Sequence, residues 1–420
     1  MIRRRPCPAV LSFIPARSHL GAACFLVLFT FVALFNGAAR AEGEGQALAR
    51  EVRLAGDAKR TRLIVDLDRA PAFRAFTLAN PPRVILDLSD VTFALKPDGS
   101  QMRRGLVSAY RFGVFAPGKA RMVLEVSGPV AIDKAFVLDA VDDQPARLVV
   151  DLVKADPDTF ARSIATEAEQ RTALPAAPVA LPPPGDSRPV IVIDPGHGGI
   201  DSGTSGYSAF VEKTIVLETA LALRDRLEKA GGYRVVLTRT TDTFVPLADR
   251  VAVARANRAD LFISIHADAL ARGDGRARGA SVYTLSETAS DTESAHLADK
   301  ENKADLIAGV DLSDETDEVA GILVDLAYRE TRNFSALFAR SLVGSMKSSI
   351  RMHGTPLKSA GFQVLRAHDV PSVLVELGYM SSPDDLKQLT SEAGRDRMAD
   401  AIAAGVTQFF DRRGGPASAR

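Results

Sequence analysis

The chain has 420 residues, of which 46% are hydrophobic and 25% charged, a composition typical of globular domains rather than disordered chains. This length predicts two or three domains. The formal net charge is zero, but the first 41 residues contain five arginines and no acidic residue, so the remainder carries about −5. A mildly acidic remainder gives no reason to expect nucleic acid as a partner.

Residues 1–41 have the features of a secretory signal peptide: arginines, the apolar run Leu20–Phe35, and an A-x-A cleavage pattern at residues 39–41. Because the run is long, an uncleaved membrane anchor is the alternative. Three consecutive arginines leave the Sec and twin-arginine export routes both open. Both cysteines, Cys7 and Cys24, lie in this segment. The mature chain would therefore have no transmembrane segment and no thiol, and a metal site would need histidine and carboxylate ligands.

Residues 45–155 are predicted to form an all-β domain, because apolar runs of strand length recur with a charged residue at each flank. The four runs are Arg62–Leu67, Arg83–Leu88, Arg121–Val126 and Arg147–Leu152. The first and third begin 59 residues apart and the second and fourth 64 apart, which indicates a duplicated two-strand unit and a small β-sandwich. This segment contains no histidine, so we expect a non-catalytic binding or docking domain.

Residues 156–188 are predicted to be a linker that begins with a polar, helix-compatible stretch and ends in an Ala/Pro-rich, extended spacer. From 189 to 412, strand and helix patterns alternate, which predicts an α/β domain with a mostly parallel, twisted sheet flanked by helices. Residues 413–420 are expected to be a flexible tail. The candidate strands are Val190–Asp194, Tyr233–Thr238, Leu261–Ile265, Ala280–Leu285, Phe362–Leu365 and Ser372–Glu376. The candidate helices are Glu212–Ala230, Leu247–Asn257, Phe334–Met352 and Asp384–Phe410.

Polar residues follow these strands at the sheet edge where such folds bind ligands. His197 follows the first strand, His266 follows Leu261–Ile265, and Glu212 opens the first helix. Two histidines and a carboxylate are a typical catalytic zinc set, which supplies three ligands and leaves the fourth position for water. Glu376 ends an apolar strand and fits the separate carboxylate that accepts the proton of this water.

Each of these residues also has a structural explanation. A glutamate that opens a helix complements the helix dipole, which would account for Glu212 without a metal. A histidine that ends a strand is often a satisfied edge residue. Glu376 could form a buried ion pair with Arg366. We assign no role to His296, expected on a polar helix, or to His353 and His368, expected in loops.

The catalytic segment resembles the zinc-dependent N-acetylmuramoyl-L-alanine amidases of the amidase-3 type, and in particular the division amidases. The resemblance rests on Ile193–Gly199, Glu212-Lys213, Leu237–Arg239, Arg250 with Ala256-Asn257, Phe262–Ala267 and Pro371–Gly378. It implies zinc on His197, Glu212 and His266, with Glu376 as the catalytic carboxylate. The implied reaction cleaves the amide between N-acetylmuramic acid and L-alanine in peptidoglycan, for cell-wall remodelling and daughter-cell separation. Many members have Phe-Ile-Ser-Asn near the glutamate, where this chain has Leu377-Gly-Tyr-Met-Ser-Ser382.

The β-rich segment is similar to the AMIN domain that precedes such amidases in Gram-negative bacteria. This similarity implies a two-sheet domain that binds peptidoglycan and brings the enzyme to division sites. It also implies a periplasmic location, in agreement with the predicted signal peptide.

Residues 286–333 form a long, acidic connection, which is unusual inside a compact domain. A solvated surface excursion is the plain explanation. The resemblance to division amidases implies instead an autoinhibitory helix that an activator, of the LytM-domain type, pulls away. An acidic side chain would then occupy the open zinc position; Glu301 is the first candidate and Glu293 the second.

Two other functions remain open from the sequence. A zinc peptidase would cut peptide cross-links instead of releasing whole stem peptides. A wall-binding scaffold would have lost its activity, which the intact set of His197, Glu212, His266 and Glu376 argues against.

Overall fold

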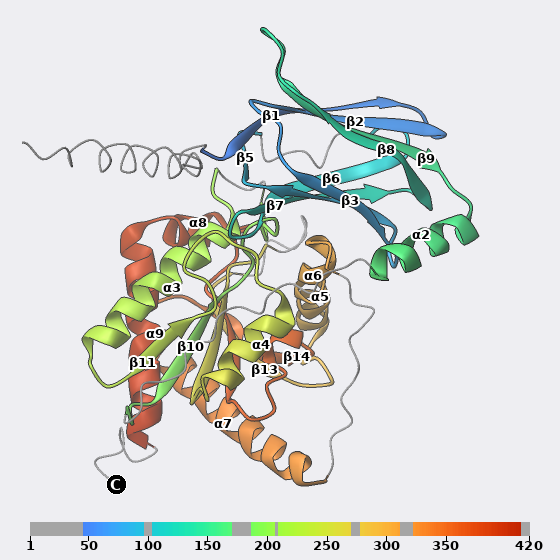
Figure 1. The fold of residues 1–420 in the computed structure, drawn as a ribbon. Coiled ribbons are helices and arrows are strands. Elements are labelled where there is room, and N and C mark those ends of the chain that lie inside the picture. The colour runs from blue at the N-terminus through green and yellow to red at the C-terminus, as the bar shows by residue number, and fades with distance from the viewer. Residues whose placement is uncertain are drawn as a thin grey trace, which may run out of the picture. The chain divides into compact units, whose positions relative to one another are not determined.

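The computed structural model describes residues 45–95, 103–169, 186–205, 209–269, 278–310 and 322–412 (Figure 1). The predicted signal peptide, residues 170–185 of the predicted linker, which contain its Ala/Pro-rich spacer, and the predicted tail lie outside these residues. Within the described residues, no helix combines the length and the apolar character that a membrane span needs.

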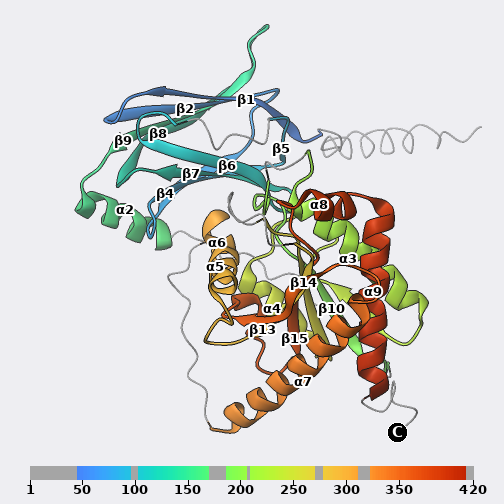
Figure 2. The same cartoon turned by 180° about the vertical axis from the view of Figure 1, so that it is seen from behind.

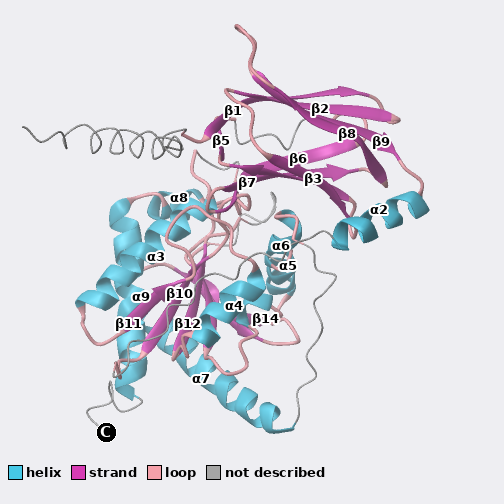
Figure 3. Ribbon diagram, in the orientation of Figure 1, coloured by secondary structure: helices cyan, strands magenta, loops and turns pink. Residues whose placement is uncertain are grey.

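The N-terminal domain is all-β and consists of two sheets (Figure 3). The five-stranded sheet has the order β5 (Val91–Phe93), β1 (Ala47–Gly56), β2 (Arg60–Leu67), β9 (Ala146–Lys154) and β8 (Val130–Leu138). The four-stranded sheet has the order β3 (Phe73–Leu78), β4 (Arg83–Ser89), β7 (Lys119–Val126) and β6 (Val107–Ala116). Apolar side chains of both sheets form one buried cluster, as expected for a sandwich. The helix α2 (Pro157–Glu169) follows β9.

The four charged-flanked runs are the strands β2, β4, β7 and β9, and their pairing explains the charges. In one sheet Arg62 stands opposite Asp151, and in the other Asp87 stands opposite Arg121. Each arginine reaches its partner carboxylate at 2.6 Å. The apolar middle of each run thus fills the core, while a charged residue near an end of each run forms a cross-strand ion pair. The duplication itself stays a prediction.

The second domain is built on a six-stranded sheet of order β11-β10-β12-β15-β13-β14. Its strands are β10 (Val190–Pro195), β11 (Arg234–Leu237), β12 (Leu261–His266), β13 (Ala280–Leu285), β14 (Met352–Ala360) and β15 (Ser372–Glu376). Four neighbouring strands are parallel, and β13 is antiparallel to β15. The predicted mostly parallel sheet is confirmed.

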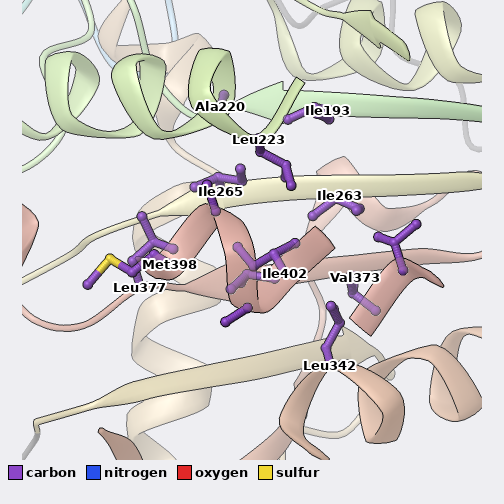
Figure 4. Packing of buried hydrophobic residues seen from close by; sticks show 14 of the residues in the cluster. Ile193, Ala220, Leu223, Ile263, Ile265, Leu342, Val373, Leu377, Met398 and Ile402 are labelled. Atoms are coloured by element: carbon purple, nitrogen blue, oxygen red, sulfur yellow. The ribbon is translucent and has the colours of Figure 1, made fainter. Parts of the chain in front are cut away.

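Helices cover both faces of this sheet (Figures 1 and 2). One face packs against α3 (Glu212–Lys229), α7 (Ile322–Met346) and α9 (Glu392–Arg412). Leu223, Leu342 and Ile402 from these helices meet Ile263 and Val373 of the sheet (Figure 4). The other face packs against α4 (Leu247–Ala256), α5 (Thr292–Glu301) and the 3₁₀ turn η2 (Gln363–Leu365). The remaining helices are α6 (Ala304–Ile307) and α8 (Pro383–Leu389).

One predicted strand is wrong. Residues 362–365 form the turn η2, and the edge strand of the sheet is β14 instead. The sequence of β14 contains Gly354 and Pro356, which argue against a strand unless it lies at a sheet edge, where proline is tolerated. His353 therefore lies in a strand rather than in a loop.

Two predicted helices have different bounds. The helix predicted at 334–352 is α7, which begins and ends earlier. The helix predicted at 384–410 is divided into α8 and α9. Ser391 lies between them, and its hydroxyl accepts the backbone N–H of Gly394, so a serine cap starts a new helix.

Leu342→Ala should destabilise the catalytic domain by about 2–5 kcal/mol, because it leaves a cavity under α7. Leu342 is fully buried, whereas Leu337 on the same helix is 47% exposed. The matched change Leu337→Ala should therefore alter stability by less than about 0.5 kcal/mol. Chemical denaturation of the full chain, followed by helical circular dichroism, measures both free energies of unfolding. Equal losses would contradict the assigned core.

Candidate metal centre

The sheet brings three strand ends to one edge. β10, β12 and β15 are parallel neighbours, with Pro195 opposite Ile265 and His266 opposite Glu376. His197 follows β10 by two residues. All strand residues of β12 and β15 are buried, as expected for strands covered on both faces. The local apolar runs therefore fix where the polar residues that terminate them must lie.

The loop after β10 lets two imidazoles approach closely. A side chain at Gly196 would overlap the ring of His266, so only glycine fits there. The ring centroids of His197 and His266 lie 4.8 Å apart at 75°. His197 itself has a φ of 57°, which buried arginines support: Arg250 donates to its carbonyl at 2.8 Å and Arg239 to that of Gly196 at 2.7 Å.

Three ligand atoms meet at this edge. Oε1 of Glu212 lies 3.1 Å from Nε2 of His197 and 3.4 Å from Nδ1 of His266. Ligand atoms of the three residues lie within 4.8 Å of one another. Both ring nitrogens are buried and neither has a hydrogen-bond partner. Buried polar atoms without partners are costly, and two imidazoles with one carboxylate are a donor set that suits zinc. The residues therefore fit a metal ion.

Neighbouring groups orient these ligands. Oδ2 of Asp201 lies 2.8 Å from Nδ1 of His197, which leaves Nε2 of that ring to face the centre. Glu212 accepts the backbone N–H of Ala267 at 2.9 Å on one oxygen and that of Thr204 at 2.8 Å on the other. A carboxylate behind a ligating histidine fixes its tautomer and raises its basicity.

The electrostatics of the centre favour a cation. Burial alone would lower the pKa of His197, but nearby carboxylates, Glu212 foremost, outweigh it and hold that pKa well above its usual value. Burial would raise the pKa of Glu212, but the charge of His197 and the close contact with both imidazole rings hold that pKa well below its usual value. Because a proton and a metal ion compete for the same ring nitrogen, the raised pKa of His197 opposes metal binding at low pH.

Glu376 is placed beside the centre and keeps one oxygen free. Its Oε2 accepts the backbone N–H of Asp268 at 3.0 Å, while Oε1 is buried without a partner. Burial raises the pKa of Glu376 well above its usual value, and neighbouring negative charges act in the same direction. The alternative pair with Arg366 is not formed, because Arg366 is exposed. His368 contacts Arg255 at 3.2 Å.

Glu301 reaches the ligand cluster from α5. Its Oε2 lies 3.2 Å from Nδ1 of His266 and 3.4 Å from Nε2 of His197. The side chain is only 6% exposed, and its Oε1 has no hydrogen-bond partner. The helix that carries it, α5, lies inside the acidic segment 286–333. Glu301, the first candidate from the sequence, therefore lies beside both histidines of the cluster.

Glu293, the second candidate, does not lie at the ligand cluster. Its Oε1 accepts the hydroxyl of Tyr379 at 2.9 Å and lies 3.1 Å from Nζ of Lys358. Glu293 is in the first turn of α5 and Glu301 is its last residue, so one helix length separates them. The prediction for Glu293 is wrong because only the C-terminal end of α5 faces the cluster.

The sequence alone did not single out four further residues of the centre. Asp201 follows His197 by four residues and Asp268 follows His266 by two, so acidic residues close behind each histidine were the available signal. Thr204 gave no signal, because its backbone N–H donates to Glu212 and its hydroxyl to Asp268, and neither contact depends on a recognisable sequence pattern. Gly203 is required because a Cβ there would lie 2.6 Å from a ring carbon of His197.

Comparison with known proteins supports this geometry. The family model described as N-acetylmuramoyl-L-alanine amidase matches residues 191–408, and the AMIN domain model matches residues 51–152. The first match spans all strands of the α/β domain except part of β10, and the second falls within the all-β domain.

Similar proteins carry the same family name. The chain is 35% identical over 364 residues to the N-acetylmuramoyl-L-alanine amidase AmiC of Escherichia coli O6:H1, covering 83% of this chain and 86% of that protein. AmiC of Neisseria meningitidis serogroup B is 34% identical over 367 residues, covering 84% and 87%. The solved N-acetylmuramoyl-L-alanine amidase from Clostridium difficile 630 is 26% identical and covers 55% of this chain and 100% of that chain, with a TM-score of 0.39.

Asp201→Asn should weaken zinc binding by roughly 10- to 100-fold, because the orienting carboxylate behind His197 is lost. Competition with a chelator of known affinity measures the dissociation constant of the full chain. Asp225→Asn is the matched control, since the Asp225 side chain is 63% exposed on α3. Unchanged affinity in Asp201→Asn would exclude this role.

Proposed function

The chain belongs to the N-acetylmuramoyl-L-alanine amidases, and on this premise we propose that it hydrolyses the amide between N-acetylmuramic acid and L-alanine in peptidoglycan with zinc bound to His197, Glu212 and His266. One observation carries the proposal. Two buried, unpartnered ring nitrogens meet a carboxylate oxygen at the sheet edge where Glu376 presents its own free oxygen.

The residues divide the work of hydrolysis. Zinc at the three ligands would supply the positive charge that polarises the scissile carbonyl. Glu376 takes a proton from the attacking water and passes it to the departing L-alanine nitrogen. Its raised pKa suits a group that must hold this proton between the two steps. The backbone N–H of Asp268 fixes one oxygen of Glu376, which leaves Oε1 to exchange the proton.

The closed state of the site supports self-inhibition. His197 and His266 are each 5% exposed, and Glu212 and Glu376 are fully buried, so a polymer cannot reach them. We propose that the segment 286–333 blocks the enzyme and that Glu301 occupies the position substrate needs. An activator protein, of the LytM-domain type, would bind only the open state and shift the population towards it.

The remaining assignments concern location. The resemblance to periplasmic division amidases supports export to the periplasm after removal of residues 1–41. The AMIN domain would bind peptidoglycan and bring the enzyme to division sites. Sec and twin-arginine export both remain consistent with the N-terminal arginines.

Glu301→Ala should raise the release of stem peptides from purified peptidoglycan about tenfold or more, since each ~1.4 kcal/mol removed from the closed state changes the open population about tenfold. The assay uses mature protein from Glu42 with zinc. Glu287→Ala is the control, because Glu287 is an exposed carboxylate in the same segment. No gain from Glu301→Ala would contradict the inhibitory role of this residue.

Adding Glu376→Gln to Glu301→Ala should lower the rate by roughly 10²–10⁴, the usual contribution of a general acid–base residue. A zinc chelator should stop the Glu301→Ala enzyme, and zinc should restore it. Mass analysis identifies the products: an amidase frees whole stem peptides from intact glycan, whereas a peptidase cuts cross-links. Activity that resists both chelation and Glu376→Gln would exclude the proposed mechanism.

A further inference from the structure

Two consecutive side chains of α5 enter the centre. Beside Glu301, Lys300 forms a close ion pair with Oδ1 of Asp268 and donates to the hydroxyl of Thr204 at 3.1 Å. Its Nζ lies 3.5 Å from Oε1 of Glu301. The resting chain thus places an oxygen at the metal ligands and an N–H donor next to it. We call Asp268 and Thr204, which receive this donor, the acceptor pair.

The acceptor pair is part of the reaction centre. The Thr204 hydroxyl donates to Oδ1 of Asp268 at 2.6 Å. The Thr204 backbone N–H donates to Glu212, a proposed metal ligand, and the Asp268 backbone N–H donates to Glu376, the proposed proton carrier. The pair therefore bridges the two groups between which the scissile amide must lie.

Asp268 loses its ion-pair partner when α5 leaves. Its side chain is only 3% exposed in the closed state, and a buried carboxylate is costly unless it is paired. Lys300 supplies the only cation at this carboxylate among the described residues. Once the helix moves out, Asp268 keeps the donors of Thr204 and Ala269 but loses its cation, and an N–H of the entering substrate can take the place of Lys300 at the same oxygen.

We propose that in the open enzyme the acceptor pair binds the N–H of the scissile amide on the L-alanine side, and that Glu301 and Lys300 imitate the carbonyl oxygen and N–H of this amide. The inference rests on the proposed function. With its N–H held by Asp268, the amide nitrogen can direct its developing lone pair towards Glu376, whose proton it receives. The backbone N–H of Asp268 donates to Glu376, so Asp268 lies next to the proposed proton carrier. This position favours the N–H of the scissile amide over donors further along the stem peptide.

The test measures substrate binding without turnover. The parent is the mature chain with Lys300→Ala, Glu301→Ala and Glu376→Gln, which opens the site and keeps substrate intact. The probe is N-acetylmuramoyl-L-alanyl-D-isoglutamine, which contains the scissile amide and no cationic group. Calorimetry with zinc-loaded protein gives the dissociation constant.

Asp268→Ala in this parent should weaken binding roughly tenfold or more, because a hydrogen bond to a charged group is lost. Asp268→Asn keeps an acceptor oxygen and should lose less. Thr204→Val removes only the hydroxyl and should weaken binding a few-fold. Asp225→Asn, on the exposed side of α3, should leave binding unchanged. Bound zinc and melting temperature, measured for each variant, show whether the centre has stayed intact.

Two outcomes would overturn the inference. In the first, Asp268→Ala and Thr204→Val bind the probe as tightly as the parent does. In the second, these variants weaken the binding only of a longer probe with a basic third residue, which would show that the acceptor pair binds an ammonium group. Failure of the proposed function looks different. In that case the chain with only Lys300→Ala and Glu301→Ala releases no stem peptides from peptidoglycan although it binds zinc.

Discussion

The structure depends on holding two imidazoles and one carboxylate together in a buried cluster, in which one nitrogen of each ring has no hydrogen-bond partner. Three parallel strands end at the same edge, and their packing on both faces prevents His197 and His266 from turning towards water. Gly196 and Gly203 have no side chain, which leaves room for the two imidazole rings to approach each other. Since no described residue hydrogen-bonds to these ring nitrogens, the cluster fits a metal ion, which would offset the cost of their burial.

The same negative field raises the pKa of two neighbouring groups with different roles. Carboxylates around the centre raise the pKa of His197 and also raise that of Glu376. A raised histidine pKa means that the proton is lost only at higher pH, so metal affinity should increase as pH rises through it. A raised pKa of Glu376 suits a residue that accepts a proton from water and then passes it to the leaving group.

The helix α5 is held in place at both ends. Its N-terminal end is capped by Asp291 and held through Glu293, which contacts Tyr379 and Lys358. Its C-terminal end delivers a cation and an anion to the reaction centre. The hydroxyl of Tyr379, three residues after Glu376, is therefore one of the groups that hold α5 in place.

The sequence by itself determined the two domain classes, the strands that carry the centre, and the residues His197, Glu212, His266 and Glu376, because apolar runs and the polar residues that end them are local signals. It placed η2 wrongly and missed β14, since an edge strand with glycine and proline lacks that signal. Only the tertiary structure decided that Glu301 rather than Glu293 faces the cluster of His197, Glu212 and His266, and that Lys300 meets Asp268. Those contacts depend on the path and rotation of α5 across the sheet, which join residues far apart in the chain and leave no periodic trace in it.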